Sequence, residues 1–224
     1  MITPEDNRKL LRQAAQLPLV YRVPGGRGHH SEAGWTRDLS EGGIGLELPE
    51  RLRQHTWLAL RLGTALGVVW AEGQVVWVGL PTTPTGGTPH GICLGEIHPT
   101  QQDRLQELLQ ALARAPHAAS RLPLGLAVTC QPQHPGGLSL PGRTINVGRG
   151  GLGLLLPAAL APGTAVQLTL RPARHPLRVE GVIAWVEPEN RRVPPEPLIT
   201  HGLQFTGLDW ALARTLGALL MEIG

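Results

Sequence analysis

The stretch DLSEGGIGL at residues 38–46 has a second copy, NVGRGGLGL, at residues 146–154. Three further pairs of segments match in the same order along the 224 residues. They are LPLVYRV at 17–23 with LPLGLAV at 122–128, GQVVWV at 73–78 with GVIAWV at 181–186, and HGICL at 90–94 with HGLQF at 201–205. Four collinear matches rarely arise by chance, so the chain is one module written twice. We place the two domains at residues 1–115 and 116–224.

Each copy has the pattern of several short strands followed by one helix. The segments LALRL at 58–62 and VQLTL at 166–170 alternate as half-buried strands do, and glycine- and proline-rich turns separate such segments. Thr100 and Asp209 are the predicted N-caps of the two helices. The apolar faces of these helices comprise Leu105, Leu108, Leu109 and Leu112, and Trp210, Leu212, Leu216, Leu219 and Leu220. We therefore expect a mainly β fold: two tandem small antiparallel β-barrels, each followed by a C-terminal α-helix packed on its own sheet.

The composition is that of a folded protein without a membrane span. Hydrophobic residues make up 42% and charged residues 17%, and no apolar run approaches the ~18–20 residues that a membrane helix needs. No secretory signal opens the chain, so we expect a cytoplasmic protein. Cys93 and Cys130 are isolated, which argues against a disulfide framework and a zinc knuckle. The net charge of +3 fits anion binding, although a GC-rich genome would also favour arginine.

Two polar elements of the first copy are candidates for ligand binding. Asp38 and Ser40, two apart on extended chain, would project from one face, and Gly43 would permit close backbone approach. Alone, this motif is better explained by an Asx- or Ser-turn that satisfies its own backbone. Arg8 and Arg12, four residues apart before the first strand, could grip a doubly phosphorylated ligand together. The alternative for the arginines is a solvated amphipathic turn.

Together these elements resemble the signature of the PilZ domain family, bacterial receptors of the second messenger cyclic di-GMP. That signature is Arg-x-x-x-Arg, a strand, and then Asp/Asn-x-Ser-x-x-Gly, and residues 8–12 and 38–43 match it at every position. The resemblance implies that both arginines contact the phosphates and guanine of cyclic di-GMP. It further implies that Asp38 accepts hydrogen bonds from guanine, that Ser40 bonds to the ligand, and that Gly43 leaves room for it.

The second copy departs from this signature. Asn146 is allowed at the aspartate position, but Gly148 replaces the serine. When residues 122–123 are set against 17–18, His117 takes the place of the second arginine and Ala113 that of the first. We therefore predict little or no dinucleotide binding there, and a structural or partner-binding role for the second barrel.

The leading hypothesis is a cytoplasmic cyclic di-GMP receptor that binds its ligand through the first domain and uses no cofactor. A ligand-independent adaptor for an unidentified protein partner is the alternative, and nucleic-acid binding by a barrel of such low net charge has thin support. No catalytic fingerprint is present, so an enzyme is not expected. His29 and His30 lack the spacing and carboxylates of a metal site. We expect Trp70, Trp77 and Trp185 in the core or at a barrel mouth.

Overall fold

The structure is a computed structural model, and it describes residues 11–25, 31–134, 136–172, 176–187 and 198–223. Two compact units make up the chain: Met1–Leu122 together with Asp209–Gly224, and Pro123–Leu208. The first unit is therefore discontinuous, because the C-terminal segment of the chain belongs to it. None of the helices within the described residues combines the length and apolarity that crossing a membrane requires.

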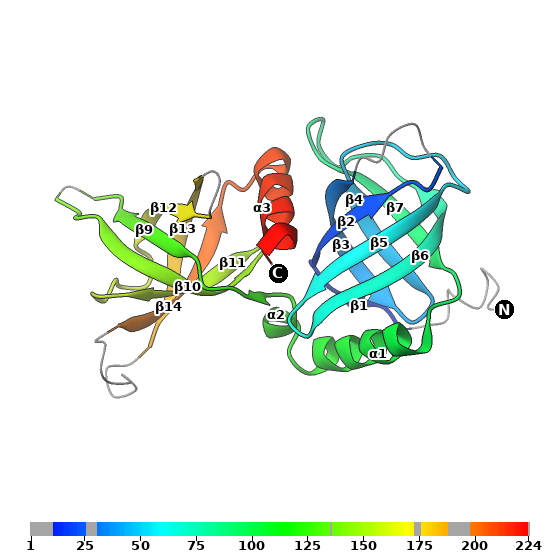
Figure 1. The fold of residues 1–224 in the computed structure, drawn as a ribbon. Coiled ribbons are helices and arrows are strands. Elements are labelled where there is room, and N and C mark those ends of the chain that lie inside the picture. Colours follow the sequence, from blue (N-terminus) through cyan, green and yellow to red (C-terminus); the bar gives the residue numbers. More distant parts are fainter. Residues whose placement is uncertain (1–10, 26–30, 135, 173–175, 188–197, 224) are drawn as a thin grey trace. The chain divides into compact units, whose positions relative to one another are not determined.

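Seven strands form the sheet of the first unit, and six of them close into a barrel (Figure 1). They are β1 (Gln13–Ala14), β2 (Pro18–Arg22), β3 (Glu32–Ser40), β4 (Gly43–Leu48), β5 (Trp57–Thr64), β6 (Gly67–Val78) and β7 (Thr88–Leu94). The order β3-β2-β5-β6-β7-β4 closes through a β3–β4 pairing, and β1 is added alongside β3. Alternate residues face the interior, as Leu58, Leu60 and Leu62 of β5 do, so the predicted period of two places leucines in the core.

The second unit repeats this topology. Its sheet consists of β8 (Leu122–Pro123), β9 (Ala127–Pro132), β10 (Leu140–Gly148), β11 (Gly151–Leu156), β12 (Ala165–Arg171), β13 (Leu177–Val186) and β14 (Ile199–Thr206). The order β11-β14-β13-β12-β9-β10 closes through a β10–β11 pairing, with β8 beside β10. The predicted fold of two tandem antiparallel barrels is confirmed.

The helix α1 (Pro99–Arg114) follows the first barrel, and the short α2 (Pro116–Ala119) comes next. The predicted leucine face is buried at Leu105, Leu108 and Leu112. Thr100 is not the N-cap, because His98 takes that position and its Nδ1 accepts from the Thr100 N–H at 3.4 Å. Pro99 follows directly at the start of the helix, where a missing N–H costs nothing.

The helix α3 (Trp210–Ile223) ends the chain and packs on β2, β3 and β5 of the first unit. The expectation that this helix covers the sheet of its own copy is therefore wrong. Trp35 of β3 is fully buried under α3, and its Nε1 donates to the Ala213 carbonyl at 2.8 Å. Gly217 of α3 lies on the same indole, where a Cβ would be 3.0 Å from Nε1. At the position equivalent to Trp35 in β10 stands the exposed Arg143, which offers the helix no apolar surface.

Each barrel also contains one buried histidine that ties a loop to the sheet. His90 of β7 faces the Thr88 carbonyl through Nδ1 at 2.9 Å and accepts the Leu52 N–H through Nε2 at 3.1 Å. His201 repeats this arrangement with the Ile199 carbonyl and the Leu160 N–H. Since one ring nitrogen must accept, both rings are neutral. Burial accordingly lowers the pKa of both histidines.

Candidate functional site

The segment before β2, residues 13–17, pairs with β3 and so brings the residues of the predicted ligand motif together. The strand β1 pairs antiparallel with β3, with Gln13 opposite Leu39 and Ala14 opposite Asp38. Just beyond, the Thr36 hydroxyl donates to the Ala15 carbonyl at 2.5 Å and accepts from the Leu17 N–H at 2.9 Å. This pairing positions Arg12, the residue before β1, beside the end of β3.

Arg12 and Asp38 form an ion pair on the outer face of the barrel. Arg12 Nη1 lies 2.5 Å from Asp38 Oδ1, and the two side chains are 42% and 35% exposed. Glycines of β4 let both groups lie flat on the sheet: a Cβ at Gly43 would be 3.1 Å from Arg12 Nη2, and a Cβ at Gly45 would be 2.6 Å from Asp38 Oδ2. The pair is thus solvent-accessible, with nothing but backbone beneath it.

Ser40 has a different environment. Its side chain is fully buried, and its hydroxyl donates to the Gly43 carbonyl at 3.2 Å across the turn between β3 and β4. Ser40 and Gly43 are also paired residues of the two strands. This hydrogen bond is the one expected of a turn that satisfies its own backbone.

Of the five predicted ligand residues, the structure brings Arg12, Asp38, Ser40 and Gly43 together, and Arg8 lies outside the described residues. His29 and His30 lie outside them as well. Within the part of the chain that the structure describes, no group of three or more His, Cys, Asp or Glu side chains is placed to hold a metal ion.

The outer face beside Asp38 carries residues that the motif does not include. Asp38 pairs with Gly45, Gly45 with Gly91, and Gly91 with Trp77, so these four residues form one row across β3, β4, β7 and β6. Two glycines therefore form a floor between the carboxylate and an indole that is 51% exposed. Glycines in two separate strands were the sequence signal for this floor, but only the strand register shows that they are neighbours.

Trp70, Trp77 and Trp185 are about half exposed, so none of them is a core residue, which was one of the two places expected for them. For Trp77 and Trp185 the reason is a shift in strand register just before each indole, between Val75 and Trp77 and between Ile183 and Trp185. Such a β-bulge moves the following residue to the opposite face of the sheet.

The second unit keeps part of this arrangement. Asn146 pairs with Gly153, Gly153 with Gly202, and Gly202 with Trp185, which reproduces the row of the first unit. The Asn146 side-chain oxygen accepts the Gly153 N–H at 3.0 Å. Gly148 stands where the first unit has its serine, so the loss of that hydroxyl is as the sequence indicated.

The strand pairings correct the alignment of the two N-terminal segments. Pro18 lies opposite Trp35, whereas its counterpart opposite Arg143 is Ala127. Counting back from these two residues makes Arg121 the counterpart of Arg12, and His117 the counterpart of Arg8. Aligning residues 122–128 with 17–23 was therefore wrong. The second copy has kept one arginine of the pair, and burial lowers the pKa of that Arg121 side chain.

Comparison with known proteins places this arrangement in a family. The family model described as the PilZ domain matches residues 6–111 and again residues 118–222. A search of curated proteins gave no match.

Similar solved structures include the PilZ domain of YcgR from Escherichia coli with c-di-GMP, at 17% identity and a TM-score of 0.42, covering 49% of this chain and 94% of that one. The inhibitor of motility MotI/DgrA from Bacillus subtilis is 12% identical with a TM-score of 0.36, covering 94% and 96%. MrkH of K. pneumonia is 11% identical with a TM-score of 0.41, covering 93% and 85%. Because the family model matches both copies over nearly their whole length, the chain belongs to the PilZ domain family, with two such domains in tandem.

Proposed function

We propose that this protein is a cyclic di-GMP receptor that binds the dinucleotide on the outer face of its first barrel. The observation that carries the proposal is the exposed ion pair of Arg12 and Asp38 above Gly43 and Gly45. A guanidinium group and a carboxylate at 2.5 Å offer the donors and acceptors that complement guanine and phosphate. Membership of the PilZ domain family supports this ligand, because the described residues of the signature, Arg12, Asp38, Ser40 and Gly43, lie together here.

The chemistry assigns a role to each residue of the site. Arg12 and Arg8 would donate to the phosphate oxygens or to O6 and N7 of guanine, and Asp38 would accept from the N1 and N2 donors of the base. Gly43 would leave space for the ligand. Ser40 would act through the turn that it closes, since its hydroxyl is buried on the Gly43 carbonyl.

Trp77 extends this site beyond the motif. Its half-exposed indole stands at the far end of the row that begins at Asp38, with Gly45 and Gly91 between them. Glycine gives the floor no side chains, so a planar base could lie on the backbone and stack against the indole.

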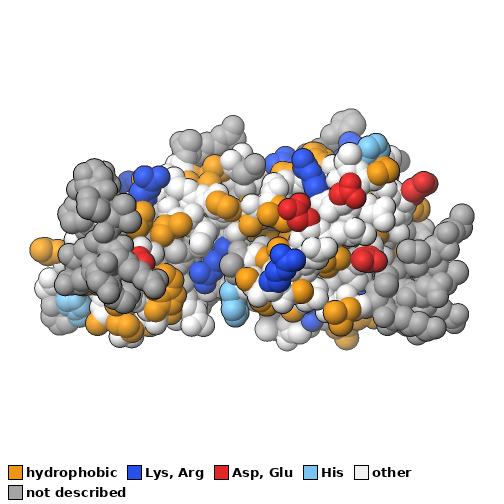
Figure 2. All heavy atoms as spheres, turned by 90° about the horizontal axis from the view of Figure 1, so that it is seen from below, with side chains coloured by type: hydrophobic (Ala, Val, Ile, Leu, Met, Phe, Trp, Pro, Cys, Tyr) orange, Lys and Arg blue, Asp and Glu red, His pale blue; other side chains and the backbone are white. Residues whose placement is uncertain are grey.

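The second unit suggests an additional adaptor role. This unit keeps the row from Asn146 to Trp185 but lacks the serine and the first arginine of the signature. We therefore propose that the second unit mainly holds a protein partner rather than a dinucleotide. A cytoplasmic, non-catalytic protein is consistent with both roles. Nucleic-acid binding is not favoured, because in Figure 2 the Lys and Arg side chains are scattered among acidic and hydrophobic ones on the face in view.

Isothermal titration calorimetry of the full chain with cyclic di-GMP tests the proposal. Arg12→Ala removes charge-assisted hydrogen bonds that contribute about 1.5–3 kcal/mol, so the affinity should fall by roughly 10- to 100-fold. Arg178→Ala, which removes an exposed arginine of the second unit, should bind as the unmodified protein does. Absence of heat from the unmodified protein, or equal affinity of the two variants, would contradict a receptor function and favour the ligand-independent adaptor.

A further inference from the structure

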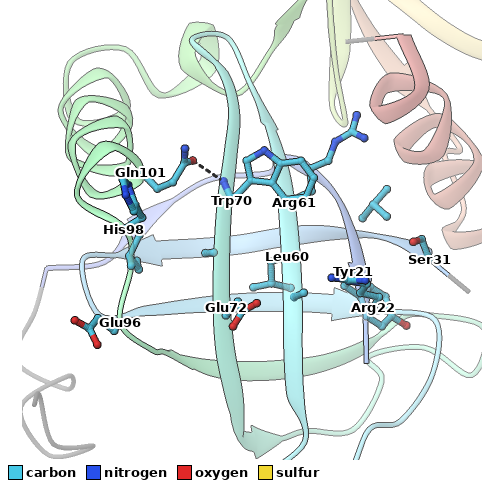
Figure 3. A pocket seen from close by; sticks show the side chains of 14 residues that line it. Tyr21, Arg22, Ser31, Leu60, Arg61, Trp70, Glu72, Glu96, His98 and Gln101 are labelled. Carbon is cyan, nitrogen blue, oxygen red and sulfur yellow. Dashed lines mark hydrogen bonds between the residues drawn. The ribbon is translucent and has the colours of Figure 1, made fainter. Parts of the chain in front are cut away.

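A groove of the first unit lies on the outer face of β2, β5 and β6, apart from the row that joins Asp38 to Trp77. It has a volume of about 610 Å³ (Figure 3). Two rows of outward residues line it: Val20 pairs with Arg61 and Arg61 with Trp70, and Arg22 pairs with Ala59 and Ala59 with Glu72. The side chains of Val20 and Ala59 are small and form the floor of the groove, and the longer side chains around them form its walls.

The segment that leads into α1 forms one wall of this groove and fixes its shape. The Gly95 N–H donates to the Glu72 carbonyl at 2.9 Å, which sets Glu96 beside the groove. At the start of α1, the Gln101 side-chain oxygen accepts the Trp70 N–H at 2.8 Å. The Trp70 N–H of β6 is therefore already paired with α1 and is not available to an added strand.

Trp70 lines this groove, and Trp57 stands on the outer face beside it, outside the lining. Trp57 and Trp70 are 49% and 55% exposed, and along the outer face they stand on either side of the Ala59–Glu72 pair. A Cβ at Gly95 would lie 3.2 Å from the Trp57 ring, so this indole rests on the segment that carries Glu96. The side chains of Glu72 and Glu96 are exposed, and neither forms an ion pair with any residue that the structure describes.

Two arginines line the groove: Arg22, at the far end of the row from Glu72, and Arg61, which is directed elsewhere. Arg61 stacks over Trp70, with its guanidinium carbon 5.9 Å from the ring centre, and its Nη2 donates to the Met221 carbonyl at the end of α3 at 2.5 Å. Figure 3 shows this guanidinium extending toward α3, away from Glu72 and Glu96. The two carboxylates thus remain available to a cation from outside the chain.

We propose that this groove binds an arginine or lysine side chain on an exposed segment of a partner protein. The aliphatic stem of such a side chain would lie against the indoles of Trp57 and Trp70, and its cationic head would meet the carboxylates of Glu72 and Glu96. The proposal does not depend on the proposed dinucleotide site, which uses β3, β4, β7 and the other end of β6.

The second unit supplies an internal comparison. Its counterpart of Glu72 is the exposed Glu180, but the counterparts of Trp57 and Trp70 are Ala165 and Arg178. A cationic side chain would find no aromatic surface there. The groove is therefore specific to the first unit, and Glu180 is a matched control for Glu72.

NMR of the full chain with nitrogen-15-labelled tryptophan tests the proposal. The six indole N–H signals include those of Trp57 and Trp70, which can be assigned from the Trp57→Phe and Trp70→Phe variants. The probe is a blocked heptapeptide that carries two arginines separated by glycine, and its control is the same peptide with citrulline, a neutral isostere of arginine. Saturable shifts of these two signals are expected with the arginine peptide, with at least fivefold weaker binding of the citrulline peptide.

Charge substitutions in the protein provide the second arm. The Glu72→Gln/Glu96→Gln variant should bind the arginine peptide roughly fivefold more weakly, as expected for the loss of two solvent-exposed ion pairs. Glu180→Gln should bind unchanged. All three substitutions are isosteric and at exposed positions, so the remaining indole signals should stay in place and report an intact fold. Absence of shifts at Trp57 and Trp70, equal binding of the citrulline peptide, or less than a twofold effect of the double variant would overturn the proposal.

Discussion

Adding one methyl group at Gly45 should weaken cyclic di-GMP binding strongly while the barrel stays folded. In the structure a Cβ at this position would lie 2.6 Å from Asp38 Oδ2 and 2.9 Å from its Cγ and Oδ1, whereas ordinary van der Waals contact begins at 3.4 Å. The carboxylate must therefore leave the sheet surface and its place at Arg12. The backbone itself accepts alanine, because Gly45 does not have a positive φ.

The expected magnitude follows from the contacts that the displaced carboxylate would lose. Charge-assisted hydrogen bonds contribute about 1.5–3 kcal/mol, which corresponds to roughly 10- to 100-fold in the dissociation constant. The cost to folding should be small, since Asp38 is partly exposed and can adopt another rotamer for about 1 kcal/mol. The Gly45→Ala variant should thus show a nearly unchanged melting temperature and a much weaker calorimetric signal with cyclic di-GMP.

Two further variants make this test specific. Gly153→Ala is the matched control, because its Cβ would lie 3.2 Å from Asn146 Oδ1 in the second unit, and it should bind as the unmodified protein does. Asp38→Ala should lose the same affinity as Gly45→Ala, and the double variant should lose no more than either alone, because both act through one carboxylate. Full affinity in Gly45→Ala, or additive losses in the double variant, would refute this reasoning.

Three other predictions concern stability. Trp35→Phe removes the hydrogen bond to a carbonyl of α3 and should lower the free energy of unfolding in urea by about 1–2 kcal/mol; an unchanged value would contradict the docking of α3 on the first barrel. Ser40→Ala should lower it by about 1 kcal/mol and weaken dinucleotide binding less than Arg12→Ala does, whereas a larger binding loss would point to direct contact with the ligand. His90 and His201 have pKa values lowered from 6.5, so the unfolded chain binds more protons and stability should fall as the pH drops below about 6.5; equal unfolding midpoints at pH 7.5 and pH 5.5 would exclude this linkage.

Several features of the fold could be predicted from local patterns. Alternation in segments such as 58–62 identified half-buried strands, and leucines at helical spacing identified α1. The repeated stretch at 38–46 and 146–154 identified two copies of one topology. These patterns are visible in the sequence because each arises from contacts between residues close in the chain or from the simple period of a strand or helix.

Other features escaped the sequence because they depend on register between distant strands. The bulges before Trp77 and Trp185 reversed the face on which these indoles lie, and a continuous period of two could not reveal them. The correspondence of Arg121 with Arg12 was hidden by a stronger local match of residues 122–128, and it emerged only from the partners of β2 and β9.

The sequence by itself determined the composition of the proposed ligand site and the existence of two barrels, because the motif residues and the strand period are properties of short segments. Only the tertiary structure decided which barrel α3 covers, that the Ser40 hydroxyl bonds within its own turn, and that Asp38, Gly45, Gly91 and Trp77 form one row. Each of these depends on side chains brought together from positions far apart in the chain, where burial and strand pairing, rather than local pattern, select the neighbours.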